Sequence, residues 1–159
     1  SYPFMIFAGS TTAAMIMKTE RGLKVAFLGA LLTMLLDVII DPISKLGSQW
    51  FLGEIYYYVE NGFYFGVPFS NFAGWFLVSL AVILFNQGIW QLTGGKGETL
   101  NMGKKEILYP AFYAGIGLFG AAIAAYISAY GIFAANLAIV CVVIIASVKA
   151  LKSSRRALP

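Results

Sequence analysis

Residues 23–42 read LKVAFLGALLTMLLDVIIDP, and this stretch decides the fold class. Between Leu23 and Ile40 the charged residues are Lys24, near the start, and Asp37, about one turn before the end. A helix that crosses the hydrocarbon core of a bilayer needs about 20 largely apolar residues. The stretch therefore predicts a membrane-spanning helix that carries an acidic side chain.

Four further apolar runs are bounded by charged or turn-forming residues, and the first of them is short for a span. The five expected spans are 2–17, 23–40, 69–92, 107–129 and 131–148. They predict an all-α integral membrane protein, a bundle of five transmembrane helices or of four full helices and one partial helix. We expect residues 1–159 to form a single transmembrane domain.

The composition agrees with a membrane protein and excludes several kinds of site. Of the 159 residues, 60% are hydrophobic and 11% are charged, and the mean hydropathy is +0.81. The net charge of +4 comes from short basic clusters rather than a basic stripe with aromatics, so we expect no nucleic-acid partner. With no histidine and one cysteine, Cys141, we expect no metal site, haem, cofactor or intrachain disulfide.

Residues 42–68 join two of the expected spans and read PISKLGSQWFLGEIYYYVENGFYFGVP. This segment is too polar, and too rich in glycine and proline, to cross a bilayer. Its apolar residues recur at helical spacing, in the order Ile43, Leu46, Trp50, Phe51, Ile55 and Val59. We therefore expect an interfacial amphipathic helix here, on the outer side of the membrane.

The basic residues fall almost entirely on one side of the expected bundle. Ten of the eleven Lys and Arg residues lie in 18–24, 96–105 and 149–156, and only Lys45 lies opposite. Because cytoplasmic loops carry an excess of Lys and Arg, we expect a multi-pass protein of the cell membrane with a cytoplasmic C-terminus. The outer half holds Asp37, Asp41, Glu54 and Glu60, so the chemistry should be sought there.

Asp37 and Asp41 lie four residues apart, on one face of a helix. Asp41 precedes Pro42, which fits the N-cap and first residue of a new helix. Asp37, one turn deeper, is either a functional group in an apolar span or an acid near the interface that accepts hydrogen bonds. If both face inward, burial and mutual repulsion leave one of them protonated, and a neutral carboxylic acid can protonate an alkene.

Ten aromatic side chains occur within residues 56–76. One interpretation is an interfacial aromatic belt, which the triple tyrosine at 56–58 favours. The other is a pocket whose aromatic faces stack on a conjugated ligand or stabilise a carbocation. Gly66 and Pro68 would shape the turn into the next span, with Asn71 as a polar group one turn inside.

The fourth expected span carries two stripes of small residues. They are Gly117, Ala121, Ala125 and Ala129, and beside them Gly120, Ala124 and Ser128. Small residues at this spacing let helices approach closely in lipid, so we expect a packing face, or alternatively a smooth groove for a long apolar ligand.

An ordered series of motifs runs through residues 30–80. It consists of Asp37, Asp41-Pro42, Trp50, Gly62-Phe63-Tyr64-Phe65-Gly66-Val67-Pro68, Asn71-Phe72 and Gly74-Trp75. This series resembles the core of a family of membrane carotenoid-biosynthesis proteins that includes hydratases of acyclic carotenoid end groups. Two departures are Phe51 in place of a spaced tryptophan after Trp50, and a length that corresponds to the C-terminal part of longer members.

The resemblance implies the cofactor-independent addition of water across the terminal 1,2 double bond of a lycopene-type end group. It implies two catalytic residues, a protonated Asp37 as the proton donor and Asp41. Either Asp41 or Asn71 would position the water, and Tyr64 or Trp75 would hold the tertiary cation. The implied substrate-binding residues are Trp50, Tyr64, Phe65, Asn71, Phe72 and Trp75.

A second hypothesis is a non-catalytic, carotenoid-binding subunit of a larger pigment–protein assembly. Missing N-terminal helices favour this subunit, whereas the retained acids and the Gly-Val-Pro series favour the enzyme, so the sequence leaves both open. A third hypothesis, a transporter, would need broken helices and midplane charges. Apart from Asp37 the interiors of the expected spans lack charge, so this hypothesis ranks last. The expected partners are membrane lipid, a carotenoid or other polyene, and further transmembrane helices from the same family fold or another subunit.

Overall fold

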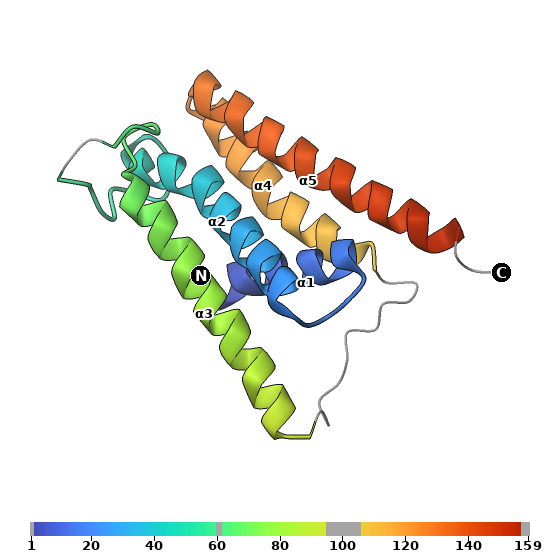
Figure 1. Ribbon diagram of the computed structural model, residues 1–159. Helices are drawn as coiled ribbons and strands as arrows, with labels where there is room; N and C mark the ends of the chain where they lie inside the picture. Colours follow the sequence, from blue (N-terminus) through green and yellow to red (C-terminus); the bar gives the residue numbers. More distant parts are fainter. Residues whose placement is uncertain (1, 60–61, 95–105, 157–159) are drawn as a thin grey trace.

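The computed structural model describes residues 2–59, 62–94 and 106–156, with side chains up to Ser153. Within these residues the chain forms helices and no strands (Figure 1). The helices are α1 (Tyr2–Met17), α2 (Leu23–Lys45), α3 (Phe69–Leu92), α4 (Leu108–Tyr126) and α5 (Tyr130–Arg156), with one 3-10 turn at Gly47–Gln49.

Four of these helices, α2 to α5, are long and apolar enough to cross a membrane. The 16 residues of α1 reach only about 24 Å, less than the hydrocarbon thickness of about 30 Å. The prediction of an all-α membrane bundle is confirmed, with four full helices and a shorter one.

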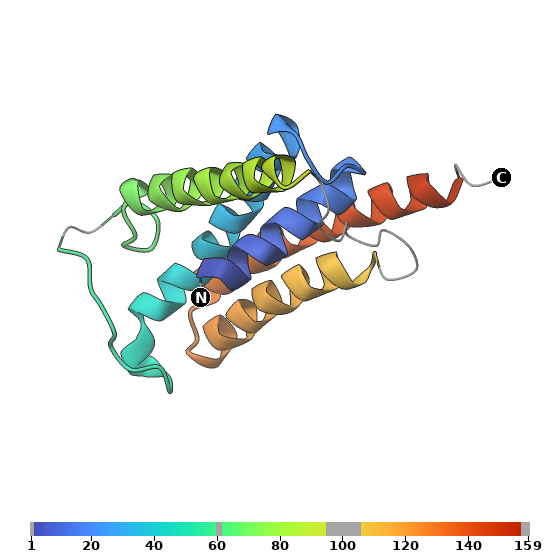
Figure 2. The ribbon, with the colours of Figure 1, turned by 90° about the horizontal axis from the view of Figure 1, so that it is seen from below.

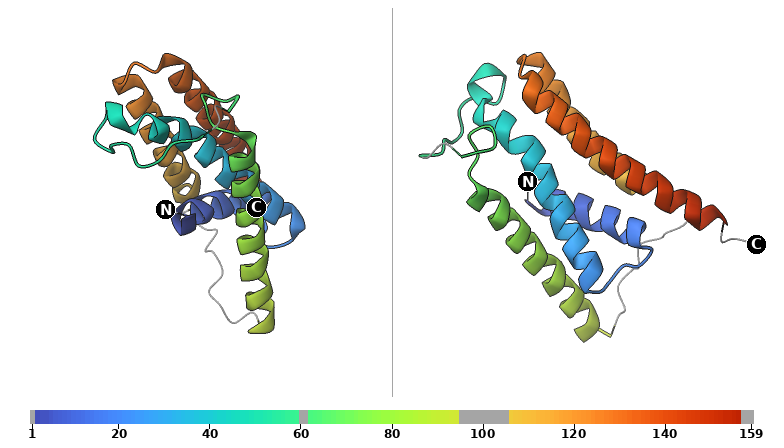
Figure 3. Two further views of the ribbon diagram at one scale, coloured as in Figure 1. Left: turned by 90° about the vertical axis from the view of Figure 1, so that its left-hand side faces the viewer. Right: turned by 45° about the horizontal axis from the view of Figure 1, so that its top comes forward.

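Helix α2 lies at the centre and contacts each of the other four helices. Helices α4 and α5 form an antiparallel pair on one side of it, and α3 runs along the other side (Figure 3). Figure 2 shows α1 between α3 and α4. Within the described residues, α3 contacts α1 and α2 but neither α4 nor α5. One side of α3 is therefore open along its length.

The core packs α1, α4 and α5 around α2. Leu36 and Leu32 of α2 pack in one cluster with Met5 of α1, Tyr113 of α4 and Val143 of α5. The hydroxyl of the fully buried Tyr113 donates a hydrogen bond of 2.8 Å to the Leu32 carbonyl. The phenol hydroxyl is thus hydrogen-bonded within an apolar core, as buried polar groups generally are.

Helix α2 continues through Pro42 to Lys45, so the expectation that Asp41 caps a new helix is wrong. Proline lacks an N–H, so the carbonyl of Val38, four residues earlier, loses its helical donor. In membrane helices, neighbouring side chains can donate to the backbone of an interrupted turn. In this turn the buried Asn136 of α5 donates from Nδ2 to the Ile39 carbonyl at 3.3 Å. The unbroken helix keeps Asp41 inside the bundle.

The prediction of an amphipathic helix between α2 and α3 is also wrong. Beyond α2 the only helical element in the described part of 46–68 is the 3-10 turn at Gly47–Gln49, and Phe51, Ile55 and Val59 are exposed outside any helix. Glycines prevent the helix: Gly53 has φ +74°, and a side chain on Gly47 would collide with the Gly53 carbonyl.

The Gly62–Pro68 motif forms a tight loop at the start of α3. The Val67 N–H donates to the Tyr64 carbonyl at 2.9 Å, and the Val67 backbone lies where a Gly62 side chain would be. Gly66 has φ +82°, which favours glycine. Val67 is fully buried, so the loop closes against the bundle and fixes where α3 begins.

The small residues of α4 serve packing. Gly117, Gly120, Ala121 and Ala124 are buried, while Ala125 and Ser128 are exposed. A Cβ atom on Gly120 would lie 2.5 Å from Ile39 Cγ2 of α2 and 3.4 Å from Asn136 Nδ2 of α5. The absent side chain lets three helices meet beside Pro42.

We expect Gly120→Leu to destabilise the bundle, because overpacking a close contact costs about 1–3 kcal/mol. The matched control is Gly115→Leu on the same helix, since Gly115 is exposed and has nothing within 4 Å of its Cβ position. The measurement is the unfolding temperature in detergent. Equal temperatures for the two variants would contradict the close approach at Gly120.

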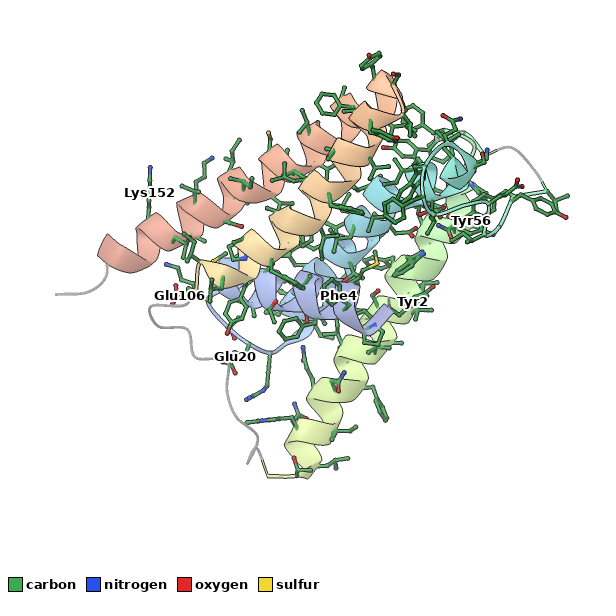
Figure 4. The ribbon with its side chains drawn as sticks, turned by 180° about the vertical axis from the view of Figure 1, so that it is seen from behind. Tyr2, Phe4, Glu20, Tyr56, Glu106 and Lys152 are labelled. Atoms are coloured by element: carbon green, nitrogen blue, oxygen red, sulfur yellow. The ribbon has the colours of Figure 1, made fainter. Side chains whose placement is uncertain are left out.

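Charged side chains of the α1–α2 connection and of α5 gather at one end of the bundle. Lys18 Nζ donates to Ser153 Oγ at 3.0 Å, and Arg21 lies 2.9 Å above the Trp90 ring centroid. Tyr56 lies at the opposite end, away from Lys152 (Figure 4). Glu60 and the basic residues at 96–105 lie outside the described residues.

Candidate functional site

One face of α2 carries the site. Asp37, Ile40, Asp41 and Ser44 follow the i, i+3, i+4, i+7 spacing of a single helical stripe. The two acids are almost completely buried, with 4% of Asp37 and 7% of Asp41 exposed. Acids this deeply buried need hydrogen-bond partners.

The stripe faces a cavity of about 390 Å³ between α2, α3, the start of α1 and the segment that follows α2. Its lining combines the polar groups with apolar and aromatic surface: Met5, Asp37, Ile40, Asp41, Ser44, Ile55, Tyr56, Tyr58, Asn71 and Trp75. A cavity with few convergent polar groups and apolar walls is typical of a small-molecule site.

One amide bridges the two acids. Asn71 Nδ2, in the first turn of α3, donates to Asp37 Oδ2 at 2.6 Å and to Asp41 Oδ2 at 3.1 Å. The two hydrogens of a single NH₂ group can serve both carboxyl groups. Asn71 thus holds the acids in one arrangement and ties α3 to α2 at this end.

Two tyrosines complete the partners of Asp41. The Tyr58 hydroxyl donates to Asp41 Oδ2 at 2.6 Å, and the Tyr56 hydroxyl donates to Asp41 Oδ1. Burial, together with the hydrogen bond to Asp41 and its negative charge, raises the pKa of both tyrosines above the usual 10.0. Both phenols therefore remain hydrogen-bond donors at neutral and moderately alkaline pH.

The tyrosine pair predicts how stability depends on alkaline pH. A folded-state pKa above the unfolded value gives stability that is complete below about pH 10 and is lost as pH rises further. We expect Tyr56→Phe/Tyr58→Phe to lower the unfolding temperature in detergent at pH 8, because hydrogen bonds to a charged group contribute about 1.5–3 kcal/mol. The difference in unfolding temperature between wild type and the double variant should become smaller above pH 10.

The control for this pair is Tyr57→Phe, since Tyr57 is 74% exposed. It should change neither the unfolding temperature nor its pH dependence. A double variant that matches wild type at pH 8 would contradict the Asp41 hydrogen bonds.

The structure brings together four of the predicted site residues, Asp37, Asp41, Asn71 and Trp75. Trp50, Tyr64, Phe65 and Phe72 do not line this cavity. Trp50 Nε1 donates to the Ile43 carbonyl at 2.9 Å, and Tyr64 packs edge to face against Phe65 and Phe72. Substrate binding by these four stays a prediction.

Sequence reasoning did not assign Tyr56 and Tyr58 as partners of Asp41. The side chains of this segment alternate in burial: Ile55, Tyr57 and Val59 are exposed, while Tyr56 and Tyr58 are half-buried. Successive side chains of an extended chain point to opposite sides. A triple tyrosine in an extended segment therefore places two hydroxyls on one side and one on the other.

The described residues contain no group of three or more His, Cys, Asp or Glu side chains that could hold a metal ion. The chemical groups gathered in the cavity are two carboxyl groups, two phenols, one amide, one hydroxyl and an indole ring. Such a set can donate and accept protons and can stabilise positive charge.

Among the described residues, four helices are long and apolar enough to span a membrane, and a buried pair of acids faces a cavity, as in a multi-pass membrane protein with a polar site. The family model for carotenoid biosynthesis proteins matches residues 1–146, and the chain belongs to this family. It acts in carotenoid biosynthesis. Neither the curated proteins nor the solved structures gave a match.

Proposed function

We propose that this protein hydrates the terminal 1,2 double bond of an acyclic carotenoid end group without a cofactor. The observation that carries the proposal is the buried pair of Asp37 and Asp41, bridged by Asn71 and facing a cavity of about 390 Å³. Family membership supplies the substrate class, because carotenoid precursors are long, apolar and rich in double bonds.

The hydrogen bonds support different roles for the two acids. Asp41 accepts from Tyr56, Tyr58 and Asn71, whereas Asp37 accepts from Asn71. Donors stabilise a carboxylate, and two adjacent carboxylates disfavour each other's charge. In the proposed mechanism Asp41 is the hydrogen-bond acceptor that positions water, and Asp37 is the general acid.

The proposed reaction adds one water molecule and involves no oxidation. The Asp37 carboxyl group transfers its proton to the less substituted alkene carbon, and the electron pair of the double bond forms the new C–H bond. The tertiary cation lies beside the Trp75 ring, which stabilises it by cation–π attraction. Water held by Asp41 attacks the cation, and its released proton passes to the carboxylates, restoring the starting state.

The proposed orientation has the C-terminus in the cytoplasm and the acid cavity near the outer face. Lys18 and Lys24 lie at the α5 C-terminal end of the bundle, whereas Tyr56 lies at the other end. This agrees with the excess of Lys and Arg in cytoplasmic loops.

The test is expression of the chain in a host that accumulates lycopene, followed by separation and mass analysis of the pigments. We expect a product heavier than lycopene by one water molecule and absent from the host with an empty vector. A folded, membrane-inserted protein that yields no such product would overturn the proposal. Unmodified lycopene that co-purifies with such a protein would instead support the carotenoid-binding subunit.

A further inference from the structure

A second cavity of about 520 Å³ runs between α1 and α3. On the α3 side, Val78, Val82 and Asn86 line it at successive i+4 positions. On the α1 side, Tyr2, Ile6 and Ser10 line it with the same spacing. Two helical stripes therefore form the walls of a groove, which is largely apolar and has polar groups at its far end.

The groove and the acid cavity share a wall. Tyr2, which lines the groove, stacks on Trp75, which lines the acid cavity, with ring centroids 3.9 Å apart and planes 6° from parallel. On α1, Met5 faces the acid cavity and its neighbour Ile6 faces the groove. Figure 4 shows Tyr2 at the beginning of α1, close to α3.

The α3 stripe continues from one cavity into the other. Asn71 and Trp75 line the acid cavity, and Val78, Val82 and Asn86 line the groove. At about 1.5 Å per residue, the rise from Asn71 to Asn86 is about 22 Å. The two cavities thus lie one after the other along most of α3, with the acids at one end.

From this geometry we propose that the groove between α1 and α3 binds the polyene chain of the carotenoid whose end group lies in the acid cavity, an inference that rests on the proposed function. Small-molecule sites measure about 300–1,000 Å³, and the acid cavity is at the lower end of that range. A carotenoid is much longer than this cavity, so its chain must leave it. The groove lies directly next to it and offers apolar walls.

The stacked pair suits a conjugated chain at the junction. Flat aromatic rings pack favourably against flat conjugated groups in offset or edge-on arrangements. Tyr2 and Val78 are partly exposed, at 43% and 46%, so the groove opens at the side of the bundle. A polyene dissolved in lipid can therefore enter sideways, between α1 and α3.

The experiment measures the lycopene bound by the full chain, purified in lipid nanodiscs, from its absorption per protein at fixed total lycopene. Two variants fill the groove from opposite walls, Val82→Trp on α3 and Ser10→Phe on α1. The matched control is Leu77→Trp, since Leu77 lies on α3, is 62% exposed and does not line the groove. Unfolding temperatures show which variants are folded.

We expect each folded groove variant to bind lycopene at least about tenfold more weakly than wild type, with the control unchanged, because a bulky side chain removes the space for the chain. Unchanged binding in the folded groove variants, or no lycopene bound by wild type, would overturn the proposal. Weaker binding in both variants, without any hydrated product from wild type, would support the groove as the polyene site and overturn the hydratase. Hydration by wild type, with full binding in both variants, would support the hydratase and overturn the groove as the polyene site.

Discussion

Asp37→Asn should abolish the hydrated product. General acid catalysis contributes roughly 10²- to 10⁴-fold, and an amide cannot transfer a proton to an alkene carbon, so we expect turnover to fall at least about 100-fold. Asn has nearly the shape of Asp and can still accept a hydrogen bond from Asn71. Lycopene conversion in membranes that contain equal amounts of protein measures the effect.

The matched control for Asp37→Asn is Glu54→Gln, because Glu54 is an exposed acid in the segment between α2 and α3. It should convert lycopene as wild type does. Asp37→Asn should remain folded and should still bind lycopene, which separates loss of chemistry from loss of substrate binding. Full activity in Asp37→Asn would exclude this residue as the proton donor.

Asp41→Asn should block the second half of the reaction and leave the first half in place. Asp41 accepts from Tyr56 on one oxygen and from Tyr58 and Asn71 on the other. Asparagine keeps only one of these acceptors, and its NH₂ group would face the remaining donor or donors without accepting from them. The attacking water then loses both its base and its position. We expect alcohol formation to fall at least about 100-fold, as for loss of a general base.

Deuterated water distinguishes the two acids. In Asp41→Asn, the protonated Asp37 can still add a deuteron to the end group, and the cation can lose a proton and return to an alkene. We expect deuterium in recovered lycopene with Asp41→Asn and none with Asp37→Asn, measured by mass spectrometry. Deuterium uptake in Asp37→Asn would reverse the assigned roles.

Hydropathy was sufficient to predict the fold class, since long apolar runs between charges have few structural solutions in a bilayer. Within the site, the four-residue spacing of Asp37 and Asp41 correctly indicated a shared helix face. Asn71 was recognisable as a polar residue just inside the next span. Local spacing carries this information because each of these features lies within one helix or at its first turn.

The features of the fold and of the site that the sequence did not predict depend on contacts between distant segments. Pro42 signals the end of a helix locally, but α2 continues through it, and Asn136, nearly a hundred residues away, donates to the turn before it. The helical spacing of Ile55 and Val59 was misleading, because Gly47 and Gly53 fold the preceding chain into a tight turn. Tyr56 and Tyr58 follow that turn in the chain and reach back to Asp41.

The position of these tyrosines has one more consequence. Asp41 belongs to a helix that is long and apolar enough to cross a membrane, whereas Tyr56 and Tyr58 belong to a segment outside the helices. The two reactants of the proposed reaction, water and a carotenoid, do not mix. Water would arrive from the aqueous phase past Tyr56 and Tyr58, and the carotenoid would arrive from the lipid between α1 and α3. Neither reactant would need to cross the other's phase, so the proposed reaction would take place at the boundary of the bilayer.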